Sequence, residues 1–376
     1  MILKNGYVVN KDFKLKKLDI GIQNGVISDI KESLSGNDEL DLNGNYILPG
    51  FIDTHIHGAY GVRISDYNPE LEKISLFEAT QGVTSIAITT ASSLLHELYK
   101  QLEIALQASK SVTGAKIAAI HMEGPFISKT FKGAMNADCI IDSDIALFDK
   151  FLEKSGSLLK IITVAPENEN MVKFVEYAAQ KGVTVSMGHT NATYEEANKI
   201  IKAGANQLTH TFNAMRALNH REPGVLGACF TNPDIVCEVI CDFVHLHPSI
   251  VKLIYDIKGP DRINVISDSG HAAGLDVKEF VVDGIKRYVS DGVVRLADGT
   301  IAGSTKTVLD GVKNLVSLGI PIEDISKMTS YNPAKTLKID KITGSIKQGN
   351  LADIVVLDSD YNVLYTFVNG KLVYKR

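Results

Sequence analysis

The sequence predicts an α/β protein: a (β/α)₈ TIM barrel with a small β-sandwich domain built from both chain termini. Two observations lead to this prediction. Eight short β-type runs alternate with helical segments through the middle of the chain, and further β-type runs stand at both of its ends. The 376 residues are enough for one large domain and one small one. We expect the N-terminal part of the sandwich at residues 1–49, the barrel at 50–343 and the C-terminal part of the sandwich at 344–376.

The two ends of the chain carry strong hairpin signals. Near the N-terminus, two alternating runs flank Asn24-Gly25 in "KLDIGIQNGVISDI". Near the C-terminus, "LADIVVLDSDYNVLYTFVNGKLVYKR" contains three more β-type runs and a second tight turn at Asn369-Gly370. Because a lone hairpin is marginal in water, we expect the two ends to join in one small β-domain.

The central region shows the alternation typical of a barrel. Its helical segments have apolar residues at helical spacing, for example Leu95, Leu98, Leu102 and Leu106, or Val172, Val175 and Ala179. "TYEE" at 193–196 is a capping box that predicts a helix start. A doubly wound open sheet is the alternative, but no G-x-G-x-x-G follows the first run. The eight β-type runs are "GFIDTHIHG", "GVTSIAITT", "KIAAIHMEGPF", "LLKIITVAPEN", "GVTVSMGHT", "ANQLTHTFNAM", "VCEVICDFVH" and "RINVISDSG".

The composition excludes several classes of protein. The net charge is −5 and no basic block is present, which argues against nucleic-acid binding. No stretch approaches the roughly 20 apolar residues of a membrane span, and we expect no signal peptide in the first residues. The four cysteines form no C-x-x-C pair and are expected to be reduced and buried. We therefore expect a soluble cytoplasmic protein.

Imidazoles and carboxylates recur where the predicted strands end, which is where barrel enzymes place their active sites. Any one of these residues is more often structural, but six of the eight strand ends agree, so we predict a shared metal site. In the first strand, the i and i+2 positions of His55 and His57 direct both rings to one face. The complete set is His55, His57, His121, Glu123, His189, His210, Asp242, His245 and Asp268.

The types of ligand predict the chemistry. Imidazole nitrogen and carboxylate oxygen without thiolate suit Zn²⁺, Mn²⁺ or Fe²⁺ in an open catalytic site. Such a metal lowers the pKa of water and polarises a carbonyl, while a free carboxylate transfers the proton. Asp268 is the candidate for that carboxylate, because it is the last polar residue of the last strand. The predicted reaction is hydrolysis of an amide-like bond.

Five stretches carry a resemblance to a known family. They are "GFIDTHIHG", "HMEGPFIS", "GHTNATYEEA", "THTFNAMRALNHREPGVLGA" and "GSIKQGNLADIVVLD". Together they resemble the metal-dependent amidohydrolases, and most closely those that deacetylate amino-sugar phosphates. The resemblance runs from about residue 46 to 376. H-x-H and "GNLADIVVLD" are common to the superfamily, whereas "HMEGPF" and "THTFNAM…HREPG" are highly specific.

The resemblance implies roles for individual residues. Glu123, His189 and His210 would hold the main metal, and His55 and His57 would bind a second metal that shares Glu123. Asp268 would take a proton from the attacking water and pass it to the leaving amine. The cofactor would be a divalent metal (Zn, or Fe, Mn or Co), one or two per subunit. The phosphate of the sugar would be held by Asn213, Ala214, Arg221 and His245, and the sugar pocket would be lined by Ala134, Met135, Ile301, Ala302 and Gly303.

The resemblance also implies a sugar-phosphate substrate, N-acetyl-D-glucosamine 6-phosphate, and a homo-oligomer, either a dimer or a dimer of dimers. Independently of it, Arg221 lies in the Gly/Pro-containing loop "NHREPG", where a guanidinium can form paired hydrogen bonds with a phosphate. A salt-bridged surface arginine is the alternative. His247-Pro248 predicts a helix start, so either His245 or His247 can be structural.

Two positions depart from the family pattern. Met135 stands where many members have a histidine that hydrogen-bonds the acetyl carbonyl, and a thioether is a poor substitute. His271 and Ser269 replace commoner small residues after the catalytic aspartate, and the sequence leaves open whether His271 touches the metal or the sugar.

Three other functions stay open. The first is the same reaction on N-acetylgalactosamine 6-phosphate, and the second is another amidohydrolase reaction, such as that of a dihydroorotase or a deaminase. No barrel lysine is placed to form a bridging carbamate, which disfavours a dihydroorotase. The third is a scaffold that has lost the chemistry, which is disfavoured because all five metal ligands are present.

Overall fold

A computed structural model describes all residues from 1 to 376, and its centre is a closed barrel of parallel strands. The strands follow one another around the barrel in chain order. The last strand meets the first where Asp268 N–H donates to the carbonyl of His55 at 3.0 Å. The predicted barrel is therefore confirmed. Its strands are β6 (Phe51–Ile56), β9 (Val83–Ala91), β10 (Lys116–Glu123), β11 (Leu159–Val164), β12 (Thr184–Met187), β13 (Gln207–Leu208), β14 (Val236–Ile240) and β15 (Ile263–Ile266).

Helices cover the outside of the barrel. The predicted capping box opens α5, where the Thr193 hydroxyl accepts from Glu196 N–H and the Glu196 carboxylate accepts from Thr193 N–H. In α4 the buried face includes Phe174 and Val175, whereas Val172 is exposed, so the predicted stripe was partly wrong. The helices are α1 (Leu71–Thr80), α2 (Leu95–Ala108), α3 (Ile145–Ser155), α4 (Met171–Gln180), α5 (Tyr194–Ala203), α6 (Gly224–Thr231), α7 (Pro248–Lys258), α8 (Val308–Ser317), α9 (Ile322–Ser326) and α10 (Asn332–Thr336), with a π-turn at Lys327–Tyr331 and 3₁₀ turns at Ala137–Cys139 and Pro260–Arg262.

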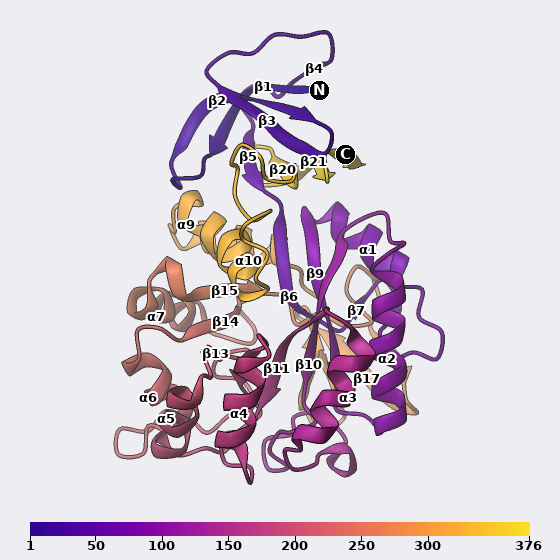
Figure 1. The fold of residues 1–376 in the computed structure, drawn as a ribbon, viewed down its shortest axis with the longest axis vertical. Coiled ribbons are helices and arrows are strands. Elements are labelled where there is room, and N and C mark those ends of the chain that lie inside the picture. The colour runs from indigo at the N-terminus through magenta and orange to yellow at the C-terminus, as the bar shows by residue number, and fades with distance from the viewer.

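The two chain ends form a separate β-sandwich-like sheet above the barrel (Figure 1). Strand β5 pairs antiparallel with β20 and thereby joins the N-terminal and C-terminal halves. Ile47 and Val8 from one half pack with Ile354 and Phe367 from the other. The strands are β1 (Ile2–Val9), β2 (Leu15–Gln23), β3 (Val26–Lys31), β4 (Glu39–Asp41), β5 (Tyr46–Pro49), β20 (Ile354–Leu357), β21 (Val363–Val368) and β22 (Lys371–Lys375).

Both predicted hairpin turns are present. Asn24-Gly25 joins β2 to β3 with φ of 50° and 82°, and Asn369-Gly370 joins β21 to β22 with φ of 48° and 73°. Positive φ at both central residues is the twist that two-residue hairpins need, and Asn-Gly adopts it with little strain.

The chain passes from the sheet to the barrel at Gly50, between β5 and β6. A Cβ at this position would collide with the Thr84 side chain, so the close crossing requires glycine. On the return path, Ile346 already packs in the core of the terminal sheet. We propose domain boundaries at 49/50 and 343/344 on these grounds.

A second small sheet lies beyond the end of the barrel strands, far from the chain termini (Figure 1). This sheet was not predicted from the sequence. It occupies the connection between β15 and α8, and a short hairpin of β7 (Gly58–Ala59) and β8 (Val62–Arg63) also follows β6. Its antiparallel strands are β16 (Glu279–Val282), β17 (Ile285–Ser290), β18 (Val293–Arg295) and β19 (Ile301–Ser304).

All four cysteines are free and buried, as expected. No helix combines the length and the apolar character that crossing a membrane requires.

Candidate metal centre and active site

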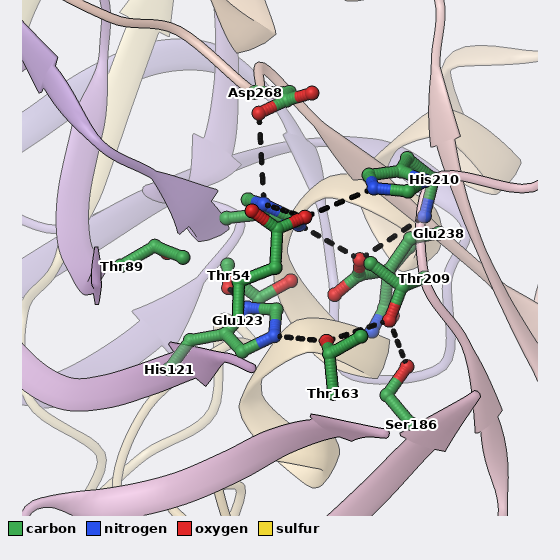
Figure 2. A network of polar contacts seen from close by, with 12 residues as sticks. Thr54, Thr89, His121, Glu123, Thr163, Ser186, Thr209, His210, Glu238 and Asp268 are labelled. Carbon is green, nitrogen blue, oxygen red and sulfur yellow. Dashed lines mark hydrogen bonds and ion pairs between the residues drawn. The ribbon is translucent and has the colours of Figure 1, made fainter. Parts of the chain in front are cut away.

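Five polar side chains from four other strand ends meet around one carboxylate, that of Glu123 at the end of β10. Glu123 Oε1 lies 2.9 Å from His210 Nε2 and 3.0 Å from His189 Nε2. The first strand contributes His55, whose Nε2 is 3.4 Å from Oε1, and His57, whose Nε2 is 3.3 Å from Oε2. The structure thus brings the five predicted metal ligands together. Figure 2 shows Glu123 between Asp268 and His210.

Three of the four rings are held by an acceptor on Nδ1. His57 Nδ1 donates to the carbonyl of Thr89 at 3.0 Å, and His189 Nδ1 donates to the carbonyl of Phe131 at 2.8 Å. A carbonyl only accepts, so these rings carry a proton on Nδ1, and Nε2 of the neutral ring offers its lone pair to the centre. His55 Nδ1 is held in the same way by the carboxylate of Glu238 at 3.1 Å.

The centre fits a cation. His189 Nε2 and His210 Nε2 are only 3.1 Å apart, so their lone pairs repel unless a positive charge lies between or beside them. His55 Nε2 is buried and has no hydrogen-bond partner, although it faces Glu123 and Asp268. A buried donor or acceptor without a partner is costly, and a bound divalent metal removes that cost.

The electrostatics of the ligand side chains agree with this fit. Burial raises the pKa of Glu123, but His55 and His189 outweigh it and hold the pKa well below its usual range. Burial lowers the pKa of His55, but the carboxylates of Glu123 and Asp268 outweigh it and raise the pKa. The Glu123 carboxylate is therefore ionised and available as a ligand, whereas the His55 ring attracts a proton that a metal must displace.

Three groups of side chains have ligand atoms within 4.8 Å of one another, the spacing that could hold an ion. The first consists of Glu123, His189 and His210, and the second of His55, His57 and Asp268. The third consists of His55, His121 and Glu238. Asp268 Oδ1 is 3.5 Å from His55 Nε2 and 3.4 Å from His57 Nε2. The predicted proton-transfer residue thus lies beside the two histidines of the second group.

Three of the site residues have a backbone conformation that side chains rarely adopt. The φ angles are 45° at His189, 26° at His210 and 48° at Asp268. Such conformations cost about 1–3 kcal/mol each and persist where neighbouring contacts enforce them. At Asp268 the enforcing contacts are its N–H bond to the His55 carbonyl and the bond that its carbonyl accepts from Ser304 N–H at 2.9 Å.

The predicted sugar-pocket residues lie on two segments beside the metal ligands. Ala134 and Met135 are half-buried in the loop that also provides the Phe131 carbonyl, and a Cβ at Gly133 would lie 3.2 Å from His189 Cε1. Ile301, Ala302 and Gly303 form most of β19, which runs past the backbone of Asp268. Their contact with a sugar stays a prediction.

The residues predicted to bind the phosphate differ in whether their side-chain donors are free or already used within the chain. His245 Nδ1 donates to buried Asp242 at 2.7 Å, which leaves Nε2 available. Asn213 turns its amide onto the carbonyls of His210 and Thr211, so its side-chain donors are used within the loop, and Ala214 follows it with φ of 51°. Arg221 is exposed, and its guanidinium makes no ion pair within the chain, whereas the nearby Glu222 pairs with Arg216.

Other polar residues at strand ends do not join the ligand groups around Glu123. His121 is fully buried, with Nδ1 bonded to the Thr54 carbonyl and Nε2 to the Thr163 hydroxyl, at the head of a hydrogen-bond chain through Thr209 to Ser186 (Figure 2). Both of its nitrogens are used in these bonds, and its ring also lies in the third group of possible ligands with His55 and Glu238, so its place in the metal rim stays a prediction.

Asp242 supports His245, and His247 is the exposed N-cap of α7, which confirms the predicted helix start. His271 stacks on Phe280 of the second small sheet with ring centroids 4.9 Å apart.

Glu238 is the main residue that the sequence analysis missed. It lies in the middle of β14, is fully buried and contacts His55. A signal was present, because Glu238 is a charged residue within the apolar run "VCEVI", and fully buried carboxylates are rare unless paired.

A barrel that gathers four histidines and two carboxylates at the carboxyl ends of its strands defines a metal-dependent hydrolase of the amidohydrolase type. The sequence matches the amidohydrolase family over residues 46–373, and the chain belongs to this family.

Known proteins closely resemble the whole chain. It is 33% identical to the N-acetylglucosamine-6-phosphate deacetylase of Lysinibacillus sphaericus, across 99% of this chain and 97% of that protein. It is 32% identical to the N-acetylgalactosamine-6-phosphate deacetylase of Escherichia coli O157:H7, across 99% and 98% of the two chains. The crystal structure of N-acetylglucosamine-6-phosphate deacetylase from Thermotoga maritima has a TM-score of 0.90 and 33% identity, with both chains fully covered.

Proposed function

We propose that the protein is a metal-dependent deacetylase that hydrolyses N-acetyl-D-glucosamine 6-phosphate to D-glucosamine 6-phosphate and acetate. The observation that carries this proposal is the convergence of four imidazole Nε2 atoms on Glu123, with Asp268 against the same centre. Full-length similarity to deacetylases of amino-sugar phosphates supports the choice of substrate.

In this proposal, Glu123, His189 and His210 would hold one divalent ion, and His55 and His57 would hold a second beside Glu123. Zinc fits the nitrogen and oxygen donors, and iron, manganese or cobalt are alternatives. Such ions, when bound, polarise the acetyl carbonyl and lower the pKa of the attacking water.

Asp268 transfers the proton. Its carboxylate accepts a proton from the water as the oxygen attacks the acetyl carbon, and then gives this proton to the sugar nitrogen as the C–N bond breaks. The products are acetate and the free amine. The position of Asp268 is set by its backbone bonds to His55 and Ser304, so the carboxylate is held in place before the substrate binds.

Met135 bears on the number of ions. A thioether cannot donate a hydrogen bond to the carbonyl oxygen, so this position leaves carbonyl polarisation to other groups. His55 and His57 are arranged so that they could bind a second ion, and this ion would then polarise the carbonyl.

His245 and Arg221 would hold the phosphate, with Asn213 and Ala214 beside them. His245 Nε2 is available because Asp242 holds Nδ1, and the free guanidinium of Arg221 can form paired hydrogen bonds with phosphate oxygens. We further propose that the protein is a homo-oligomer and that it is cytoplasmic. Light scattering measures the mass of the oligomer directly.

The test is acetate release from both N-acetylhexosamine 6-phosphates by protein reconstituted with metal. We expect release from both, with a higher kcat/KM for the gluco-configured substrate, and loss of activity after chelation. A higher kcat/KM for N-acetylgalactosamine 6-phosphate would favour the second candidate, which the similarity to the Escherichia coli protein supports. Absence of release from both would contradict the proposed function.

A further inference from the structure

Glu238 is a buried carboxylate whose two oxygens are both engaged. Oε1 accepts from the Gln207 side chain at 2.8 Å, and Oε2 lies 3.1 Å from His55 Nδ1. Oε2 also accepts a long hydrogen bond from His210 N–H at 3.4 Å. The side chains of Glu238 and His55 are both 0% exposed, so water cannot replace either partner.

We propose that Glu238 is a positioning residue for the metal centre: it holds the His55 ring with a proton on Nδ1 and with Nε2 directed at Glu123 and Asp268. This inference rests on the proposed metal-dependent function and adds a residue to it that does not itself bind the ion.

The contact spans the inside of the barrel. His55 lies on β6 and Glu238 on β14, and β15 stands between these two strands in the sheet. Glu238 thereby links the ring of a second-group ligand to the backbone of His210, a first-group ligand. Gln207 on β13 fixes the other carboxylate oxygen, so the carboxylate cannot rotate away from His55.

His55 differs from the other ligands in what holds it. His57 and His189 are oriented by backbone carbonyls, which mutation cannot remove, whereas His55 depends on one side chain. A carboxylate that accepts from Nδ1–H fixes the tautomer and makes Nε2 a stronger ligand. His55 is therefore the ligand whose metal-binding state a single substitution can change.

Glu238→Gln is the most direct test, because glutamine has the same size and shape as glutamate. Its amide, however, can either accept or donate a hydrogen bond at the position where the carboxylate only accepts. A glutamine amide can donate to Nδ1, which would leave the ring proton on Nε2 and block its lone pair. The second ion would then bind more weakly by about 10- to 100-fold, the range typical of lost outer-sphere partners. The first ion, held by Glu123, His189 and His210, should keep its affinity within about threefold.

The measurement is a zinc titration of metal-free protein followed by calorimetry, together with the crystal structure of the metal-free variant. We expect selective loss of the second binding event and a rotated or displaced His55 ring. Glu78→Gln is the matched control, since Glu78 is equally buried but touches no metal ligand. If the substitution caused only a structural defect, the affinities for both ions would fall together, or the Tm would fall without a selective loss of the second binding event.

If Glu238→Gln does not fold, Glu238→Asp answers the same question, because it keeps the charge but withdraws it by one methylene. It should weaken the second ion less than Gln would. Equal affinities for both ions in wild type and in the folded variant would overturn the inference, as would a wild-type protein that binds a single ion. Failure of acetate release from both sugar phosphates would instead contradict the proposed function.

Discussion

Asp268 and His57 face each other across the candidate metal centre, with Oδ1 of the aspartate 3.4 Å from Nε2 of the histidine. Burial raises the pKa of Asp268, but His55 and His57 outweigh it and lower the pKa to about 2. The carboxylate is thus ionised at neutral pH and ready to accept a proton, and it also lies within reach of an ion at His55 and His57.

Asp268→Asn should lower kcat by at least about 10²–10⁴-fold, because an amide cannot accept and return the proton. The ion at Glu123, His189 and His210 should remain. Steady-state assays and metal analysis on the same preparation check this. Near wild-type turnover would show that Asp268 does not transfer the proton.

Arg221→Ala should lower kcat/KM on the 6-phosphate by about tenfold to a hundredfold, since a charge-assisted contact contributes about 1.5–3 kcal/mol. Unphosphorylated N-acetylglucosamine should be affected little. Arg262→Ala is the control, because Arg262 is a peripheral arginine paired with Asp234. Equal losses on both substrates would assign Arg221 a structural role.

The double variant His55→Asn/His57→Asn should lose one bound ion per chain and much of kcat. The reason is that both rings of the second ligand group are removed while Glu123, His189 and His210 remain. Metal analysis of reconstituted protein measures the first effect, with exposed His96→Asn as the control. A fully active double variant with the wild-type metal content would exclude a second catalytic ion.

Met135→His should restore part of the activity of that double variant. An imidazole at this position can donate to the acetyl carbonyl, which would replace the polarisation lost with the second ion. In the wild-type background the same substitution should change kcat little. The kcat values of wild type, Met135→His, the double variant and the triple variant measure the coupling between residue 135 and the second ion. Additive effects on the activation free energy would mean that Met135 and the second ion are unrelated.

Glu78 gives a prediction about stability. Both of its carboxylate oxygens are buried without a hydrogen-bond partner, and burial, then the charges of Asp53 and Asp310, raise its pKa well above the usual value. A carboxylic acid whose pKa is raised by folding binds its proton more tightly in the folded state than in the unfolded state. Its full contribution to the free energy of unfolding is therefore present below the unfolded-state pKa. That contribution is lost as the pH rises toward the folded-state pKa.

Glu78→Gln should therefore become more stable than wild type as the pH increases from about 4.5 upward, the ordinary range of a glutamate pKa. Denaturant unfolding of both proteins at several pH values between 4 and 9 measures the difference. A difference in unfolding free energy that does not change with pH would mean that Glu78 titrates normally.

The missed small sheet could have been predicted from local signals. "VVDGIKRYVSDGVVRLADG" contains Asp283-Gly284 and Asp291-Gly292, and both pairs form hairpin turns with positive φ at each residue. The strands around them are short and half-exposed, so their apolar alternation is weak, and the turn residues were the better evidence.

The sequence by itself determined the barrel, the sheet formed by the two chain ends and the gathering of His55, His57, Glu123, His189, His210 and Asp268. These follow from local rules: hydrophobic periodicity marks the elements, Asn-Gly pairs mark turns, and parallel strands of a barrel end at one rim. Residues at strand ends therefore meet even when they are far apart in the chain.

Only the tertiary structure decided how the residues at that rim are arranged. His121 and His55 occupy similar positions near their strand ends, yet one is closed off by Thr54 and Thr163 and the other offers a free Nε2. The pairing of His55 with Glu238 and the placement of Asp268 beside His57 depend on cross-barrel distances. The physical reason is that a ring's hydrogen-bond partner on another strand sets its tautomer and direction, and such a partner leaves no periodic signal in the sequence.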